Sequence, residues 1–256
     1  MTYTTSKGGL EVGVIVQDTF TTIVRNPVAV GGTLALFAVL PVLAYNFLTV
    51  VLKLPVGFYE TAAGWTTLAE LVAAWLALVV LQGLGCAAMT PAVLASASGN
   101  KITLAECLRP TTQVALPVTG AQFISVFGFI LGIILLIVPG AMASAAWAVL
   151  IPAIATERLG VRAGFSRTLY LTRGHRWAVF GGLFVIGVIS ALVQIAVRFA
   201  LKPFYAGATN YWLVGFQSVV EGLSQGLSLI CAAVIYAELV RIKSGTVAGQ
   251  AASVFD

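Results

Sequence analysis

The sequence predicts an all-α integral membrane protein with six transmembrane helices and about three amphipathic helices at one membrane surface. Only 9% of its residues are charged and 59% are hydrophobic, whereas a soluble domain has about 25% charged residues. Between Arg109 and Glu157 the chain runs for 47 residues without a charged side chain. Because one helical crossing takes about 20 residues, this segment accommodates two crossings, with Pro139-Gly140 as the turn between them.

Six charge-poor segments are long enough to form the predicted spans. In chain order they are residues 28–52, 68–97, 114–138, 140–156, 177–200 and 211–240. The segments between them are too short to bury a hydrophobic core of their own. We therefore expect residues 1–256 to form a single membrane domain.

Each odd-numbered span is preceded by a segment with the pattern of a short amphipathic helix, at residues 10–25, 103–109 and 161–173. In the first segment, Asp18 and Arg25 fall opposite the apolar face, as expected of a helix in the headgroup layer. In the second, Thr103 and Glu106 have the spacing of a capping box, and Pro110 is expected to end the helix. The pattern suggests three repeats of an interfacial helix followed by a helical hairpin.

Lysine and arginine are concentrated on one side of the predicted spans. Eleven of the 14 lie on the side of the two termini, so the positive-inside rule places both termini in the cytoplasm. The net charge of +5 does not indicate nucleic-acid binding, because the arginines lie near helix ends, where anionic lipid headgroups meet them. The three cysteines have no disulfide or metal-site spacing.

The segment from Pro139 onward contains a recognisable series of residues: Pro139-Gly140, Trp147, Pro152, Glu157, Gly160, Ser166-Arg167, Leu171-Thr172-Arg173-Gly174 and Arg176-Trp177. This series resembles the pattern of a bacterial polytopic family that includes the membrane domain of glycerophosphoryl diester phosphodiesterases and the YciC-like inner-membrane proteins. The resemblance implies an integral membrane bundle in the bacterial inner membrane. It does not imply phosphodiesterase activity, because the 256 residues contain no counterpart of the soluble catalytic barrel found in the fused proteins.

Glu221 is an ionisable residue inside the last predicted span, roughly 14 Å from its outer end at a rise of about 1.5 Å per residue. Gln217, Ser224 and Ser228 fall on the same helical stripe. Gln194 would approach this stripe if the fifth and sixth spans are antiparallel neighbours. Such a stripe is a candidate ion, proton or lipid-headgroup site, although hydrogen bonding between helices accounts for it as well.

A second candidate site is basic and follows the acidic residue Glu157. Its members are Arg158, Arg162, Arg167, Arg173 and Arg176. One guanidinium group can donate two parallel hydrogen bonds to the oxygens of a phosphate. This segment could therefore hold an anionic phospholipid headgroup or an acidic partner surface. Topology signalling combined with a local ion pair at Glu157 is the simpler explanation. His175 is the only histidine, which argues against a histidine-based metal site or a Ser-His-Asp triad.

The sequence therefore predicts a non-enzymatic membrane protein without cofactor or metal, acting as a lipid-contacting scaffold or accessory subunit of a membrane assembly. Its expected partners are membrane lipids, anionic phospholipid above all, and other membrane proteins. The alternative is a transporter or channel with an intramembrane polar site around Glu221, to which Asn46, Gln82 and Gln122 on other spans would contribute. Small-residue pairs at Gly128-x-x-x-Gly132 and Gly222-x-x-x-Gly226 predict close helix packing.

Overall fold

The computed structural model describes residues 10–52, 62–135, 147–205 and 211–252. In chain order its elements are α1 (Val12–Arg25), α2 (Pro27–Leu34), the π-helical η1 (Ala35–Val39), α3 (Leu40–Leu52), α4 (Ala62–Ala97), α5 (Leu104–Leu135), α7 (Leu150–Glu157), α8 (Val161–Thr172), α9 (Arg176–Leu201), the 3-10 helix η3 (Lys202–Tyr205) and α10 (Tyr211–Ala252). Among the described residues, five helical stretches are long and apolar enough to cross a membrane: Pro27–Val50, Thr66–Ala97, Leu104–Gly132, Arg176–Phe204 and Tyr211–Ser244. The predicted all-α membrane architecture is confirmed at this level.

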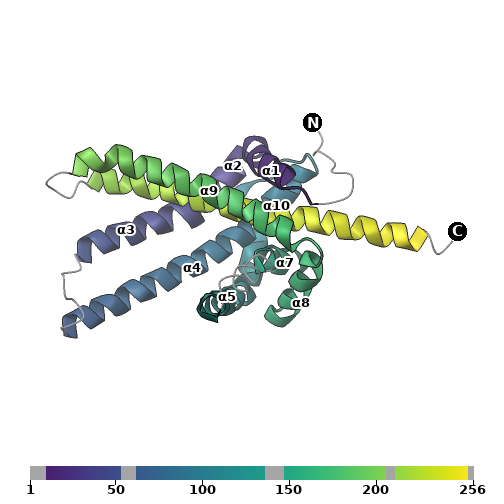
Figure 1. Ribbon diagram of the computed structural model, residues 1–256, viewed down its shortest axis with the longest axis horizontal. Coiled ribbons are helices and arrows are strands. Elements are labelled where there is room, and N and C mark those ends of the chain that lie inside the picture. Colours follow the sequence, from purple (N-terminus) through teal and green to yellow (C-terminus); the bar gives the residue numbers. More distant parts are fainter. Residues whose placement is uncertain (1–9, 53–61, 136–146, 206–210, 253–256) are drawn as a thin grey trace.

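The long helix α10 forms the centre of the bundle and packs against α9, α4, α3 and α1 (Figure 1). At one end of the bundle α3 and α9 finish and α4 and α10 begin, and we call this the α3/α9 end. At the opposite end α1, α7 and α8 lie around the second half of α10, and we call this the α1/α8 end. Residues far apart in the sequence meet at both ends.

The first predicted span is a continuous helical stretch formed by α2, η1 and α3. Pro41 lies in its interior and lacks the amide that a helix would use for its next hydrogen bond. The chain accommodates this proline by widening the preceding turn, because the Leu40 amide bonds to the carbonyl of Ala35, five residues back. The helix therefore continues through Pro41.

The second amphipathic segment differs from its prediction. The capping box is confirmed, since the Thr103 amide donates to Glu106 Oε2 at 2.8 Å and the Glu106 amide donates to Thr103 Oγ1 at 3.4 Å. The prediction that this helix ends at Pro110 is wrong, because α5 runs unbroken from Leu104 to Leu135. Buried Cys107 packs against α2 on this first part of α5, and such packing lets a buried helix tolerate a proline.

The fourth predicted span, 140–156, is only partly described. Residues 136–146 lie outside the described ranges, and the described remainder contains the short helix α7. The sixth crossing therefore stays a prediction. The third amphipathic segment does form a separate helix, α8, which the chain enters through Arg158 in the left-handed conformation (φ 51°).

Helix α1 is oriented differently from the expected surface helix. Its buried residues are Ile15, Asp18, Thr19 and Thr22. Asp18 is only 2% exposed, so its assignment to the solvent face is wrong. The reason is that α1 packs against α2, α9 and α10, so protein and not the headgroup layer covers this face of the helix.

The predicted close packing at Gly222 and Gly226 is confirmed. A Cβ atom at Gly222 would lie 2.6 Å from the Val39 Cα atom, and one at Gly226 would clash with Leu34 Cδ2. The α10 backbone thus touches the first span at the level of η1. At Gly128 a Cβ atom would meet the Trp147 ring at 2.5 Å.

Candidate functional sites

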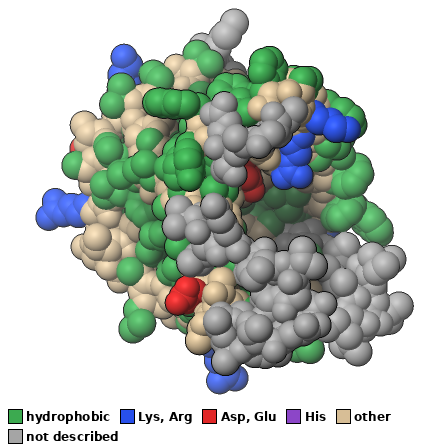
Figure 2. All heavy atoms as spheres, turned by 90° about the vertical axis from the view of Figure 1, so that its left-hand side faces the viewer, with side chains coloured by type: hydrophobic (Ala, Val, Ile, Leu, Met, Phe, Trp, Pro, Cys, Tyr) green, Lys and Arg blue, Asp and Glu red, His purple; other side chains and the backbone are tan. Residues whose placement is uncertain are grey.

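A polar cavity of about 340 Å³ lies between α3, α9 and α10 near the α3/α9 end. Its lining residues are Asn46, Thr49, Val50, Arg198, Val214, Gln217 and Glu221. Asn46 Nδ2 donates to Glu221 Oε2 at 3.1 Å and to Ser218 Oγ at 3.1 Å. The cavity therefore combines a carboxyl group, a guanidinium group, two amides and a hydroxyl inside an otherwise apolar bundle. Figure 2 views the molecule from this end and shows few charged side chains among the hydrophobic ones.

The structure brings together part of the predicted stripe around Glu221. Gln217 lines the same cavity, whereas Gln194, Ser224 and Ser228 are not among its lining residues. Ser224 is buried and its hydroxyl donates to Val220 O of its own helix at 2.8 Å. Ser190 Oγ donates to Ser224 O at 3.3 Å, which confirms that α9 and α10 are neighbours and fixes their register.

Asn46 is the residue whose importance the sequence understated. In the sequence it is one of several polar residues on other predicted spans. Only the packing of α3 against α10 shows that it is the partner of Glu221. Thr49 was missed altogether, although it lies one turn after Asn46 and its hydroxyl donates to Asn46 O at 2.8 Å. Polar residues three or four positions apart in an apolar helix are the signal that could have identified both.

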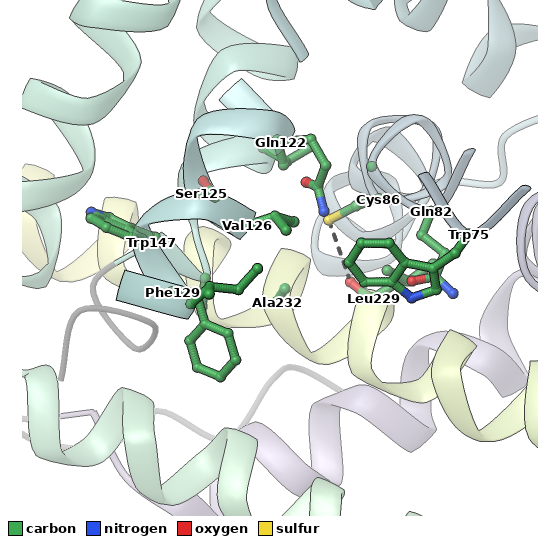
Figure 3. A pocket seen from close by; sticks show the side chains of 14 residues that line it. Trp75, Gln82, Cys86, Gln122, Ser125, Val126, Phe129, Trp147, Leu229 and Ala232 are labelled. Carbon is green, nitrogen blue, oxygen red and sulfur yellow. Dashed lines mark hydrogen bonds between the residues drawn. The ribbon is translucent and has the colours of Figure 1, made fainter. Parts of the chain in front are cut away.

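A larger and mainly apolar cavity of about 490 Å³ lies between α4, α5, α7 and α10. Figure 3 shows Gln82 and Trp75 on one side of it and Phe129 and Trp147 on the other. Gln82 Nε2 donates a hydrogen bond to Gln225 Oε1. The polar groups that line the cavity are neutral amides, two indole N–H groups, a thiol and a hydroxyl. No charged side chain of the described residues lines it, so its walls suit a hydrocarbon chain.

The predicted basic cluster is partly engaged within the protein. Arg167 Nε pairs with Glu157 Oε1 at 2.8 Å, and Tyr236 Oη, from buried α10, donates to the same oxygen at 3.1 Å. The Arg167 guanidinium carbon also lies 5.7 Å from the Tyr170 ring centroid. These contacts join α7, α8 and α10 at the α1/α8 end. An ion pair with Glu157, the simpler explanation given above, therefore accounts for Arg167.

The other arginines of the cluster face outward. Arg158, Arg162 and Arg173 are exposed and Arg176 is half-buried. Arg173 and Arg176 line a depression of about 580 Å³ together with Tyr170. The Arg173 carbonyl accepts a hydrogen bond of 3.2 Å from Lys243 Nζ, which ties the turn between α8 and α9 to α10.

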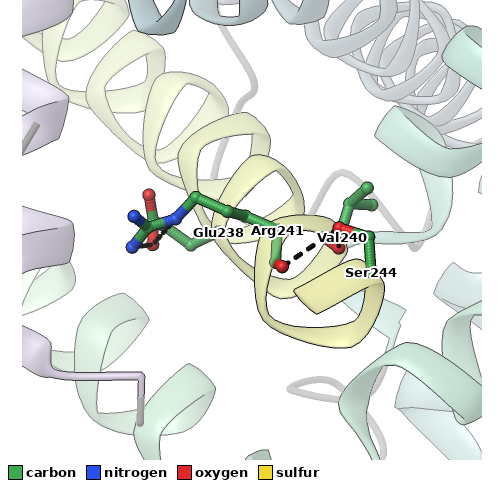
Figure 4. Close-up of polar contacts among 4 residues, drawn as sticks. All are labelled: Glu238, Val240, Arg241 and Ser244. Atoms are coloured by element: carbon green, nitrogen blue, oxygen red, sulfur yellow. Dashed lines mark hydrogen bonds and ion pairs between the residues drawn. The ribbon is translucent and has the colours of Figure 1, made fainter. Parts of the chain in front are cut away.

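A third cluster of charged side chains lies where α1 meets α10. Glu238 Oε2 pairs with Arg241 Nη2 at 2.6 Å, as Figure 4 shows. Burial and, next, the Glu238 charge raise the pKa of Asp18 to about 6, while Arg241 and Arg25 lower it in part. Asp18 Oδ2 is buried without a hydrogen-bond partner among the described residues. The contact between α1 and α10 thus contains a buried carboxyl group that takes up a proton at a higher pH than an exposed one does.

The described residues contain no group of three metal-ligating side chains. Comparisons with known proteins add no identification, since no family model, curated protein or solved structure matches this chain. The fold places this chain in the class of helical proteins with several membrane-spanning helices. The resemblance to the phosphodiesterase membrane-domain family stays a prediction.

Proposed function

We propose that this chain is a non-enzymatic protein of the bacterial inner membrane, with both termini in the cytoplasm, that acts as a lipid-contacting scaffold or accessory subunit. The cavity between α4, α5, α7 and α10 is the observation that carries the proposal. Its volume of about 490 Å³ falls within the range of about 300–1,000 Å³ typical of ligand sites. Trp75, Phe129 and Ile130 at its wall are 39%, 41% and 44% exposed, so membrane lipid has access to it.

A lipid chain in this cavity would stabilise the protein, because an empty apolar void leaves its walls without dispersion contacts on one side. The neutral lining favours a hydrocarbon chain and disfavours a charged headgroup. The headgroup of an anionic lipid is better matched by Arg173 and Arg176, which line a depression next to exposed Trp177. Aromatic and basic residues together are typical of the membrane interface.

Native mass spectrometry of the protein released from phosphatidylglycerol nanodiscs tests both contacts. Ala148→Phe should fill the cavity and reduce the number of retained lipids, and joint replacement of Arg173 and Arg176 by Gln should reduce the preference for phosphatidylglycerol over phosphatidylcholine. The matched controls are Ala191→Phe on the exposed face of α9 and Lys202→Gln at the other end of the bundle. Unchanged lipid retention in both test variants would overturn the lipid-contacting function.

The accessory role has its own test. A second protein subunit should remain bound when the chain is purified in a mild detergent from its native membrane, and its mass should appear in the same spectra. The protein purifying alone, together with unchanged lipid retention, would contradict this function.

A transporter or channel is the second candidate, and the polar cavity around Glu221 favours it. Ionisable side chains inside a membrane bundle commonly mark a solute or ion pathway. Proteoliposomes that report proton or potassium flux test this directly. Flux that is present in the wild type and lost in Glu221→Gln would support transport, and flux unaffected by that substitution would exclude this residue from the path.

A further inference from the structure

The polar cavity near the α3/α9 end carries charges of both signs. Glu221 reaches it from α10 and Arg198 from α9, while Asn46 and Thr49 reach it from α3. Helix α3, which is distant in the sequence from α9 and α10, thus joins them in placing a carboxyl group, a guanidinium group and neutral hydrogen-bonding groups around one space of about 340 Å³. Such a set is unusual where most surrounding residues are apolar.

The two charged groups do not neutralise each other directly. Glu221 is bonded to the Asn46 amide, and Arg198 makes no ion pair with another residue in the part of the chain that the structure describes. A carboxylate has more acceptor sites than one amide fills. Glu221 is half-buried and Arg198 is exposed, so a ligand that enters the cavity can reach both groups. A ligand that offers one charge of each sign would satisfy both groups at once.

We propose that this cavity binds a small zwitterion, with its anionic group on Arg198 and its ammonium group on Glu221 and Asn46. Guanidinium binds a carboxylate or phosphate through two parallel hydrogen bonds. An ammonium group donates three hydrogen bonds, and the Glu221 carboxylate and the Asn46 side-chain oxygen can accept from it. This inference concerns a different site and ligand from the lipid contacts proposed above, and it gives the second candidate function a substrate class.

Ligands of a single charge fit the cavity less well. A simple anion on Arg198 would lie in the same small space as the Glu221 carboxylate and be repelled by it. A simple cation at Glu221 would face the Arg198 guanidinium. The zwitterion could come from two sources, the headgroup of phosphatidylethanolamine or a free amino acid, and both present an ammonium group a few bonds from an anionic group.

The test measures binding to the purified chain in phosphatidylcholine nanodiscs. The probes are phosphatidylethanolamine, phosphatidylglycerol and free glycine, with native mass spectrometry for the lipids and isothermal titration calorimetry for glycine. Phosphatidylethanolamine or glycine should bind, and phosphatidylglycerol should bind more weakly at this site because it has no ammonium group. The probe that binds identifies the source of the zwitterion.

Glu221→Gln and Arg198→Gln should each weaken binding of that probe by about tenfold or more, because each removes a charged hydrogen-bonding partner. Lys202→Gln removes a neighbouring charge that does not line the cavity and should leave binding unchanged. Glu221→Gln keeps an oxygen for Asn46, so the fold is preserved, and size-exclusion chromatography confirms it. Equal binding in all variants, or binding of neither zwitterion, would overturn the proposal. Either result leaves the apolar cavity and its lipid contact unaffected.

Discussion

Asn46 on α3 and Glu221 on α10, 175 residues apart in the sequence, are joined by a hydrogen bond of 3.1 Å. This contact links the first and last membrane-spanning stretches in the half of the bundle near the α3/α9 end. Because α10 packs against several other helices, the bond holds α3 to the centre of the fold.

A double-mutant cycle of Asn46→Ala and Glu221→Ala should give a coupling energy of about 0.6 kcal/mol and at most about 1.7 kcal/mol, the range for hydrogen bonds between membrane helices. Reversible unfolding in detergent micelles measures it. Thr33→Val is the control, since the Thr33 hydroxyl bonds to the Ala29 carbonyl of its own helix and should not couple to Glu221. Additive effects of Asn46→Ala and Glu221→Ala would show that the bond contributes nothing.

Removal of the Tyr236 hydroxyl should loosen the α1/α8 end. Tyr236→Phe deletes the hydrogen bond to Glu157 while keeping the buried ring, so the free energy of unfolding should fall by about 0.5–1.5 kcal/mol. Tyr170→Phe, at an exposed position of α8, should change stability by less than about 0.5 kcal/mol. Equal stability losses in the two variants would contradict the assigned role of the Tyr236 bond.

Close packing at Gly222 makes a clear prediction. Gly222→Ala would bring a methyl group to 2.6 Å from the Val39 backbone, and this clash should cost about 1–3 kcal/mol of stability. Gly215→Ala lies on the same helix with nothing within 4 Å of the new atom, so it should be neutral or stabilising by up to about 1 kcal/mol. Thermal unfolding in the same detergent compares the two variants.

The contact between α1 and α10 should depend on pH through Asp18. Its pKa is raised from 3.8 to about 6, so the folded state holds a proton that the unfolded state releases. The associated stability is fully present below about pH 4 and is lost as the pH rises through 6. A shift of this size corresponds to a loss of at most about 3 kcal/mol of stability.

Asp18→Asn tests this dependence, because the amide is neutral at every pH. Chemical unfolding between pH 4 and 8 should show a flatter profile for the variant and a higher stability than wild type at pH 7.5. Glu70→Gln, which replaces an exposed carboxyl group on α4, should keep the wild-type profile. An unchanged profile in Asp18→Asn would show that another group titrates.

Membrane topology follows from the position of α1 beside the second half of α10 (Figure 1). Since these two parts of the chain lie at the same end of the bundle, the number of crossings between them should be even, and the five described stretches call for a sixth within 140–156. Compartment reporters after Asp256 and at Gly160 should agree with each other and disagree with one near Ala63. A reporter at Gly160 that matches Ala63 would contradict six spans.

The fold class could be predicted from the sequence because hydrophobicity and charge spacing are local properties of the chain. The charge-poor stretches identified the long helices, and the Thr103 and Glu106 capping box located the start of α5. The expected end at Pro110 was wrong because the first turns of α5 are held by packing against α2, which local proline chemistry does not reveal.

Sequence alone determined that this chain is helical and apolar enough to cross a membrane, and that Glu221 is a polar exception within its last span. Only the tertiary structure decided which residues surround Glu221, and that Asp18 is buried on the face of α1 opposite its apolar stripe. The physical reason is that periodicity orients a side chain relative to its own helix axis. Whether that direction meets lipid, water or a charged group on α10 depends on how distant helices pack.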